Sequence, residues 1–167
     1  YKRQPYTSVW SFADELNADV TRHWTGKEQA LLGVVDVDGV SYRFMGKETP
    51  EEGASVRFAT AARQLSVNVL PTQTYYTFEC GPVLLDVVFT APLLLDDLDR
   101  MSMPVNYISW QVRSADQKKH EVRVSVEAFS SLAVNTEDQA VMVEREVENG
   151  ISYLKTGTAE QLSLIHI

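Results

Sequence analysis

The sequence predicts an all-β protein, an antiparallel β-sandwich or supersandwich built from hairpins with little helix. Glu121 to Phe129 alternates apolar and polar side chains almost perfectly, which is typical of a strand with one wet face. Asp38-Gly39 and Asn149-Gly150 are dipeptides that favour two-residue hairpin turns. No segment shows a sustained 3.6-residue apolar period, so antiparallel hairpins are the expected building unit.

Four hairpins are expected in chain order. The first turns at Asp38-Gly39, between the apolar runs that flank this dipeptide. The other three pair residues 74–80 with 83–89, 108–113 with 121–129, and 141–147 with 151–156. Short helical turns are expected at Thr49–Glu52, where a capping residue precedes Pro and two acids, and at Ala59–Gln64. Neither turn is long enough to build a layer.

Composition restricts the protein classes that fit. With 167 residues, 44% of them hydrophobic, the chain has the size and composition of one folded domain. A formal net charge of -8 argues against nucleic acid and anionic membrane surfaces as partners. The single cysteine, Cys80, excludes an intrachain disulfide and a cysteine-based zinc site, and its place in an alternating strand predicts burial. No apolar run approaches the ~20 residues of a membrane helix.

The segment from Thr21 to Lys27 holds the candidate contact residues. Arg22, His23 and Trp24 are followed by Thr-Gly, and a tryptophan in such a loop is either packed or used for contact. Imidazole can donate or accept near neutral pH, which makes His23 a candidate ligand-facing group. A packed or hydrogen-bonded loop histidine is the competing interpretation. His120, beside two lysines at the start of a strand, is expected to be a solvated structural residue.

Metal, cofactor and sugar chemistry receive little support. The acidic run Asp96 to Asp99 lacks the spacing and central glycine of a calcium loop, so we expect a solvated loop in which Asp96 or Asp97 caps a following turn. We therefore expect no metal site and no cofactor. Exposed aromatic side chains could form a sugar-stacking or interdomain platform, and the candidates are Tyr6, Trp10, Trp24 and Tyr107. Trp110 shares an apolar face with Ile108 and Val112 and is expected in the core.

Several uncommon strings occur in the order found in one protein family. They are Pro5 to Ser11, the Thr21 to Lys27 segment, Leu70 to Glu79, Phe89 to Leu93, Asp96 to Leu98 and Pro104 to Ile108. From about Pro5 to about Ala159, the chain resembles the N-terminal domain of the glutaminase A family. This resemblance implies a β-sandwich that precedes a larger helical-hairpin domain, in a protein that hydrolyses L-glutamine to L-glutamate and ammonia. It also suggests a periplasmic or extracellular location, and it carries no catalytic residue onto this segment.

The resemblance sets the expected organisation. Residues 1–161 are expected to form a single β-sandwich domain, incomplete and N-terminal in a larger enzyme. Residues 162–167 resemble the translated product of a sequencing adapter and are expected to be a non-native tail of a truncated fragment. The expected partner is the downstream helical-hairpin domain of the same chain, with a small-molecule substrate at the interface.

The function of the chain by itself stays open at this point. The parent protein is expected to be an amidohydrolase, and the fragment is expected to be accessory rather than catalytic. One alternative is a carbohydrate-binding or glycoside-hydrolase accessory module, for which analogy at the level of the fold is the warrant. Another is a folding scaffold without ligand contact.

Overall fold

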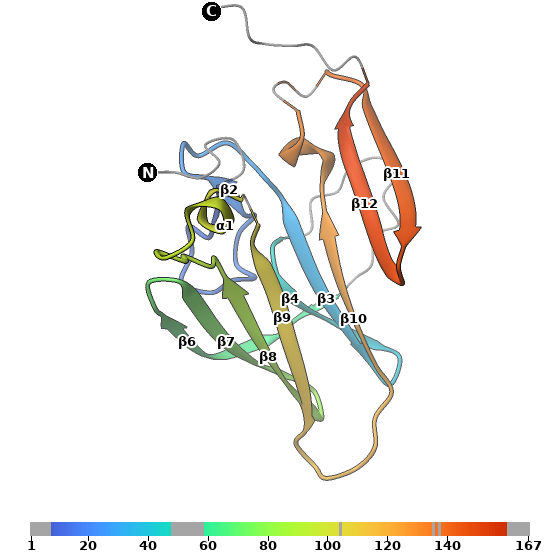
Figure 1. Ribbon diagram of the computed structural model, residues 1–167. Coiled ribbons are helices and arrows are strands. Elements are labelled where there is room, and N and C mark those ends of the chain that lie inside the picture. Colours follow the sequence, from blue (N-terminus) through green and yellow to red (C-terminus); the bar gives the residue numbers. More distant parts are fainter. Residues whose placement is uncertain (1–7, 48–58, 104, 135, 137, 160–167) are drawn as a thin grey trace, which may run out of the picture.

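The computed structural model describes residues 8–47, 59–103, 105–134, 136 and 138–159. Within these residues the chain forms two four-stranded sheets that face each other, two short ribbons and very little helix (Figure 1). Nearly all strand pairings are antiparallel, so the predicted all-β, sandwich-like fold is confirmed. In the described part of the chain, no helix is both long and apolar enough to cross a bilayer.

The first sheet has the strand order β10-β3-β4-β5. Its strands are β3 (Leu31–Val37), β4 (Val40–Met45), β5 (Thr60–Ala61) and β10 (Val122–Ala128). The predicted hairpin between β3 and β4 is present, and its turn residues Asp38 and Gly39 have φ of 51° and 85°. Asp and Gly tolerate this left-handed conformation, which explains why the dipeptide marks the turn.

The second sheet has the order β6-β7-β8-β9. Its strands are β6 (Arg63–Val69), β7 (Gln73–Cys80), β8 (Val83–Thr90) and β9 (Tyr107–Ser114). The predicted hairpin of β7 and β8 is confirmed, with Cys80 opposite Val83 and a turn at Gly81, whose φ is 60°. Successive side chains point to opposite faces, so Tyr76, Phe78 and Cys80 face the other sheet together.

Smaller elements flank the two sheets. Two ribbons and two short helices complete the described chain: β1 (Val9–Trp10) with β2 (Arg22–His23), β11 (Val141–Glu148) with β12 (Ile151–Thr158), α1 (Leu98–Ser102) and the 3-10 turn η1 (Ser130–Leu132). The predicted turn at Asn149-Gly150 is confirmed, with φ of 51° and 79°.

The expected hairpin of residues 108–113 with 121–129 is wrong. Strand β9 pairs with β8, and β10 pairs with β3 in the opposite sheet. The segment between them is therefore a crossover from one sheet to the other, as Figure 1 shows at the lower end of the molecule. Alternation specifies which face of a strand is buried but not which strand lies beside it.

The expected helical turn at residues 59–64 is also wrong. Thr60 and Ala61 form β5, which pairs parallel with β4, and Arg63 begins β6. Pairing with neighbouring strands overrides the helical preference of the alanines. The other expected helical turn, at residues 49–52, lies outside the described residues.

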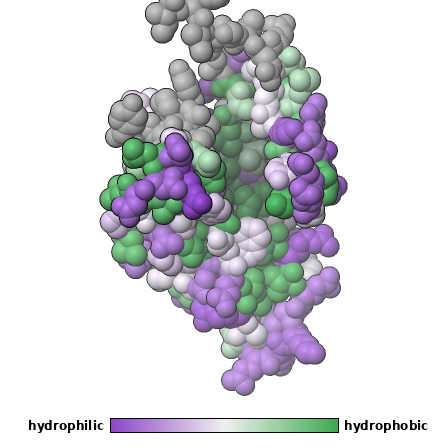
Figure 2. Space-filling model, viewed as in Figure 1, coloured by the Kyte–Doolittle hydropathy of each residue, from purple (hydrophilic) through white to green (hydrophobic). Residues whose placement is uncertain are grey.

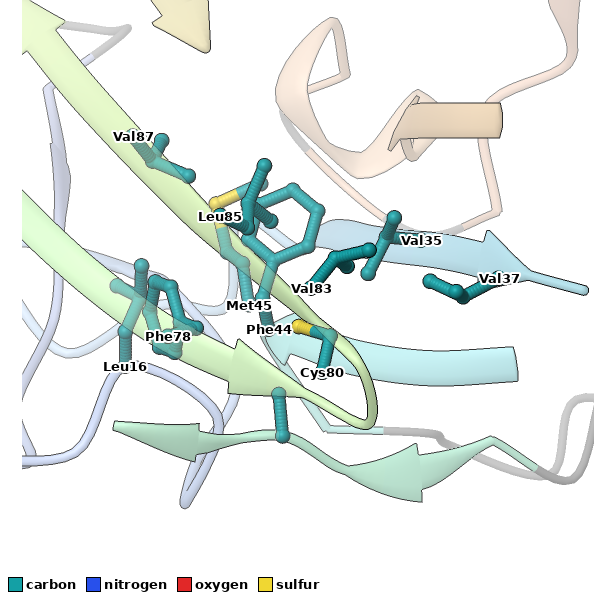
Figure 3. Close-up of a cluster of buried hydrophobic side chains, with 11 residues drawn as sticks. Leu16, Val35, Val37, Phe44, Met45, Phe78, Cys80, Val83, Leu85 and Val87 are labelled. Atoms are coloured by element: carbon teal, nitrogen blue, oxygen red, sulfur yellow. The ribbon is translucent and has the colours of Figure 1, made fainter. Parts of the chain in front are cut away.

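The core lies between the two sheets. Phe44 of β4 and Phe78 of β7 are fully buried, with ring centroids 5.9 Å apart. The fully buried valines Val35 and Val87 pack around them from β3 and β8, as Figure 3 shows. Cys80 is buried as predicted, and burial raises the pKa of its thiol to about 12. A thiol in this setting stays protonated and acts as a small apolar side chain.

Trp110 departs from the prediction that it lies in the core. Its partner on β8, Val87, is buried, which places the indole on the inner face of the sheet. However, β9 is an edge strand, and the Trp110 side chain is 50% exposed. The alternation identified the correct face, but the opposite sheet does not cover this edge.

The segment before β2 closes one end of the core. Leu16 is buried among the core side chains, and its backbone N–H donates to Oε1 of Gln64 at 2.9 Å. The buried Asn17 donates from Nδ2 to the carbonyl oxygens of Arg43 (3.0 Å) and Ala62 (2.7 Å). One amide therefore satisfies carbonyls at β4 and just after β5, which fixes the loop to the sheet.

Removing the Asn17 amide should lower the free energy of unfolding. Asn17→Ala leaves two carbonyl groups without this donor, and we expect a loss of about 2 kcal/mol, because buried polar groups without partners are costly. Urea unfolding measures the difference. Asn68→Ala on the exposed part of β6 is the control, and equal losses for both variants would contradict this role.

Candidate functional site

Residues 21–29 form a short, closely hydrogen-bonded hairpin loop. The His23 N–H donates to the Lys27 carbonyl at 2.7 Å, and Gly26, with φ of 93°, allows the reversal of the chain. The buried Thr21 hydroxyl donates to the Gln29 carbonyl at 2.7 Å and accepts from the Leu31 N–H at 2.8 Å. These bonds hold the loop against the start of β3, so its side chains project from a fixed base.

Arg22 is held by carboxylates of its own neighbourhood. Its Nε lies 3.4 Å from Oδ2 of Asp19, and its Nη1 lies 3.2 Å from Oε1 of Glu28. The hydrogen bond to Asp19 raises the pKa of the guanidinium and lowers the pKa of the Asp19 carboxyl. These interactions make Arg22 a brace for the loop, while its charge stays at the surface.

His23 and Trp24 lie next to each other at the surface. Their ring centroids are 5.3 Å apart, and His23 Nδ1 lies 2.7 Å from the Thr25 hydroxyl oxygen. The Trp24 side chain is 51% exposed, and Trp10, across the β1–β2 ribbon from Arg22, is 55% exposed. The structure thus places the three predicted residues in one loop, with the Trp24 side chain about half exposed.

Two adjoining hollows lie beside this loop. The smaller has a volume of about 330 Å³ and is lined by His23, Thr25, Lys27 and Gln29 on one side and by residues 132–134 on the other. The larger, of about 480 Å³, reaches from Lys27 and Val134 to Glu127 and Val141. Lys27 donates from Nζ to the Val134 carbonyl at 3.3 Å, where the two hollows meet.

The walls of the hollows combine charges of both signs with apolar side chains. Lys27, Glu28 and Glu127 supply the charges, while the ends of β10 and the beginning of β11 supply Ala128 and Val141. Such walls suit a small polar molecule or the polar edge of a second domain. In the described part of the chain, no group of three or more His, Cys, Asp or Glu side chains could hold a metal ion.

The other proposed aromatic platform residues are Tyr107 and Tyr6. Tyr107 is 55% exposed but lies on β9, in the second sheet, whereas Trp10 and Trp24 belong to the loop region around β1 and β2. Tyr6 lies outside the described residues. Trp10 and Trp24 are thus the described candidates near the β1–β2 ribbon.

The acidic run from Asp96 to Asp99 has a structural role at α1. The Asp97 carboxylate accepts from the Arg100 N–H at 2.9 Å, so Asp97 is the N-cap, as predicted for Asp96 or Asp97. Its other oxygen lies 3.2 Å from Arg100 Nε. The Asp97 carboxylate therefore both caps this turn and pairs with Arg100.

His120 lies far from the loop site and links the crossover to the first sheet. Its Nδ1 is 2.6 Å from Asp38 Oδ2, and its Nε2 is 2.8 Å from Asp116 Oδ1. The structural role was expected, but the side chain is only 10% exposed, so a solvated position is wrong. The hydrogen bonds to Asp116 and Asp38 raise the His120 pKa and lower those of both carboxyls. When protonated, the imidazole can donate to both carboxylates and so bridges the turn and the crossover.

Sequence reasoning missed the opposite wall of the hollows. Lys27 and Gln29 lie close to the predicted triplet, and their position next to it was a usable signal. Residues 130–134 are over 100 positions away, and nothing in their apolar and serine-rich sequence indicates a contact with the loop. Only the path of the chain after β10 brings them there.

Comparison with known families divides the chain into two matched segments. Residues 72–166 match the family described as "Domain of unknown function (DUF5127)", which is more than half of the chain. The chain belongs to the DUF5127 family. Residues 2–56 match a second family, "Domain of unknown function (DUF4964)". The loop with Arg22, His23 and Trp24 lies in the DUF4964 segment, and residues 132–134 of the facing wall lie in the DUF5127 segment.

One curated relative of this DUF5127 chain is Glutaminase A of Aspergillus oryzae (strain ATCC 42149 / RIB 40). The two are 24% identical over 169 residues, which cover 96% of this chain and 23% of the relative. The chain therefore spans less than a quarter of the length of that protein, and the identity shows a distant relationship. None of the solved structures matches the chain.

The His120 bridge predicts a pH-dependent contribution to stability. Because the folded pKa of His120 is raised, its contribution is complete below about pH 6.5, the unfolded value, and is lost as pH rises through the folded value. The contributions of Asp116 and Asp38 to stability have the opposite pH dependence. They are complete above about pH 3.8, the unfolded pKa, and are lost as pH falls through the lowered pKa values of the folded state.

His120→Ala should therefore lower Tm more at pH 5.5 than at pH 9. Thermal unfolding of both proteins across this range measures the difference. The variant Lys119→Ala, next to His120 in the crossover, is the control and should show no such pH-dependent gap. A Tm difference for His120→Ala that is constant with pH would argue against the charged bridge.

Proposed function

We propose that this chain is an accessory β-sandwich domain of a glutaminase A-like hydrolase. In this proposal the parent protein hydrolyses L-glutamine to L-glutamate and ammonia, and a downstream helical-hairpin domain carries the catalytic residues. The β-sandwich packs on that domain and shapes one side of the substrate cleft. The observation that carries the proposal is the relationship to Glutaminase A along 96% of this chain but only 23% of the relative.

The geometry of the two hollows supports a site at a domain boundary. Small-molecule sites often lie between domains, where a second surface completes the walls. Here the hollows carry charges of both signs and lie beside the loop that holds the half-exposed Trp24. In the proposed protein, Trp24 and His23 contact the facing domain or the substrate, while Arg22 keeps the loop in shape through Asp19 and Glu28.

The two matched segments act as one unit in this proposal. Strand β3, from the DUF4964 segment, pairs along its whole length with β10, from the DUF5127 segment. Their side chains also share one core, since Val35 and Phe44 pack with Phe78 and Leu85. We therefore treat residues 1–161 as a single domain in this proposal.

Two experiments test the proposal in order. Reading the source DNA past the codon for Gln161 shows whether a long segment of amphipathic helices follows in frame; a stop there would remove the proposed catalytic domain.

In the longer protein, Trp24→Ala should raise KM for glutamine roughly fivefold, since an aromatic contact contributes about 1 kcal/mol. Tyr75→Ala, on the outer face of β7, is the matched control and should leave KM unchanged.

The kinetic result separates two roles for the loop. Unchanged kcat and KM in Trp24→Ala, with a lower Tm, would leave only a folding scaffold. A raised KM with an unchanged Tm would support a contact at the cleft.

A carbohydrate-binding module is the second candidate, because Trp10 and Trp24 are both about half exposed near one ribbon. Indole faces in such positions can stack on sugar rings. Titration with oligosaccharides should then quench the tryptophan fluorescence, and Trp24→Ala should weaken the response. A flat titration would count against this candidate.

A further inference from the structure

The two faces of the β11–β12 ribbon differ in composition. Register places Val143 opposite Thr156, Arg145 opposite Leu154 and Val147 opposite Ser152, so these side chains share one face with Val141. Apart from Arg145, this face carries no charge. The other face carries all the remaining charges of the ribbon, Glu144, Glu146, Glu148 and Lys155, interspersed with Met142, Ile151 and Tyr153. Lys155 pairs with Glu146 at 2.7 Å. Alternation of this kind is typical of a strand pair with one buried and one solvated face.

The apolar face of this ribbon is nevertheless open. Val143 is 64% exposed, Val147 62% and Leu154 77%. In β10, by contrast, the alternating valines Val122 and Val124 pack against the core. A two-stranded ribbon is at best marginally stable in water without a covered apolar face. The pattern thus calls for a partner surface that the described part of the chain does not supply.

The ribbon face continues into the open side of the sandwich. Val141, at the start of β11, lines the 480 Å³ hollow. On the inner faces of the edge strands, Trp110 of β9 is 50% exposed and Val126 of β10 is 36% exposed. Figure 2 shows an apolar hollow between the second sheet and the ribbon, seen as in Figure 1. These exposed apolar side chains lie on the side where the sandwich is not closed, around a hollow whose walls also carry Lys27, Glu28 and Glu127.

We propose that this surface, the face of Val141, Val143, Val147 and Leu154 with Trp110 and Val126, docks the remaining polypeptide of a glutaminase A-like protein. This inference rests on the proposed accessory function and assigns it a location. Both strands of the ribbon lie within the segment that matches the DUF5127 family, so the ribbon belongs to the family region. The relative's further length, beyond the 23% matched here, is the source of the occupant.

The charges on the surface define the chemistry of the occupant. Arg145 lies in the middle of the apolar face, so a docked surface must be apolar and must offer an acceptor to the guanidinium. A second copy fits poorly, because a two-fold contact through this centre would bring two Arg145 side chains together. Each copy also carries a formal charge of -8, which opposes self-association.

Hydrogen exchange tests this assignment. Amides of residues 141–158 are compared between this chain alone and the longer protein, and the second state should exchange at least ~10-fold more slowly if the ribbon is covered. Leu154→Glu, on the apolar face, should abolish that protection. Ile151→Glu, an aliphatic residue of the same strand on the charged face and 57% exposed, is the matched control and should keep it.

The outcomes separate this inference from the proposed function. Protection at residues 22–29 and 130–134, with the ribbon exchanging as in the isolated chain, would overturn the docking surface and leave the accessory role. No added protection anywhere would overturn both. Concentration-dependent protection of the ribbon in the isolated chain, with a doubled mass in light scattering, would assign the surface to a second copy and also overturn the inference.

Discussion

The packing of Phe44 against Phe78 is the contact on which the rest of the structure depends. Each ring comes from a different sheet and is fully buried, so the pair defines how closely the two sheets approach. The crossover from β9 to β10 and the His120 bridge close the sandwich at one end. At the other end the sheets part, and the loop of residues 21–29, η1 and the ribbon lie there (Figure 1). The closed end maintains the fold, and the open end offers surfaces for contact.

Much of the fold follows from local chemistry in the sequence. Asp38-Gly39 and Asn149-Gly150 adopt the left-handed conformations that their residue types favour, so both hairpins could be predicted. Pairing across longer distances could not. The sequence places Trp110 on an apolar face, but its exposure depends on β9 being an edge strand, which is a property of the whole sheet. Periodicity indicates a face, whereas a neighbour is selected by all the strands together.

The candidate site likewise has a part that could be predicted from local sequence and a part that could not. Arg22, His23 and Trp24 are adjacent in sequence, so their placement in one loop was predictable, and the unusual tryptophan signalled it. Their supports were less visible: Asp19 and Glu28 brace Arg22 from nearby positions. The facing wall at residues 132–134 comes from the far side of the crossover, beyond the reach of any local pattern. Buried Asn17 ties its segment to β4 and to the residue after β5, yet it looks like an ordinary loop residue until its two acceptors are known.

Gly33 of β3 lies against the ring of Phe44 and makes room for its contact with Phe78. A Cβ atom at this position would overlap the ring of Phe44, and the register of β3 against β4 shifts at the same place. Because residue 33 has no side chain, the buried ring of Phe44 can occupy the space beside its Cα atom. Among related sequences, the side-chain volumes at these two positions should vary inversely, because a methyl group gained at one must be given up at the other. Such inverse variation would show that natural selection has maintained this contact.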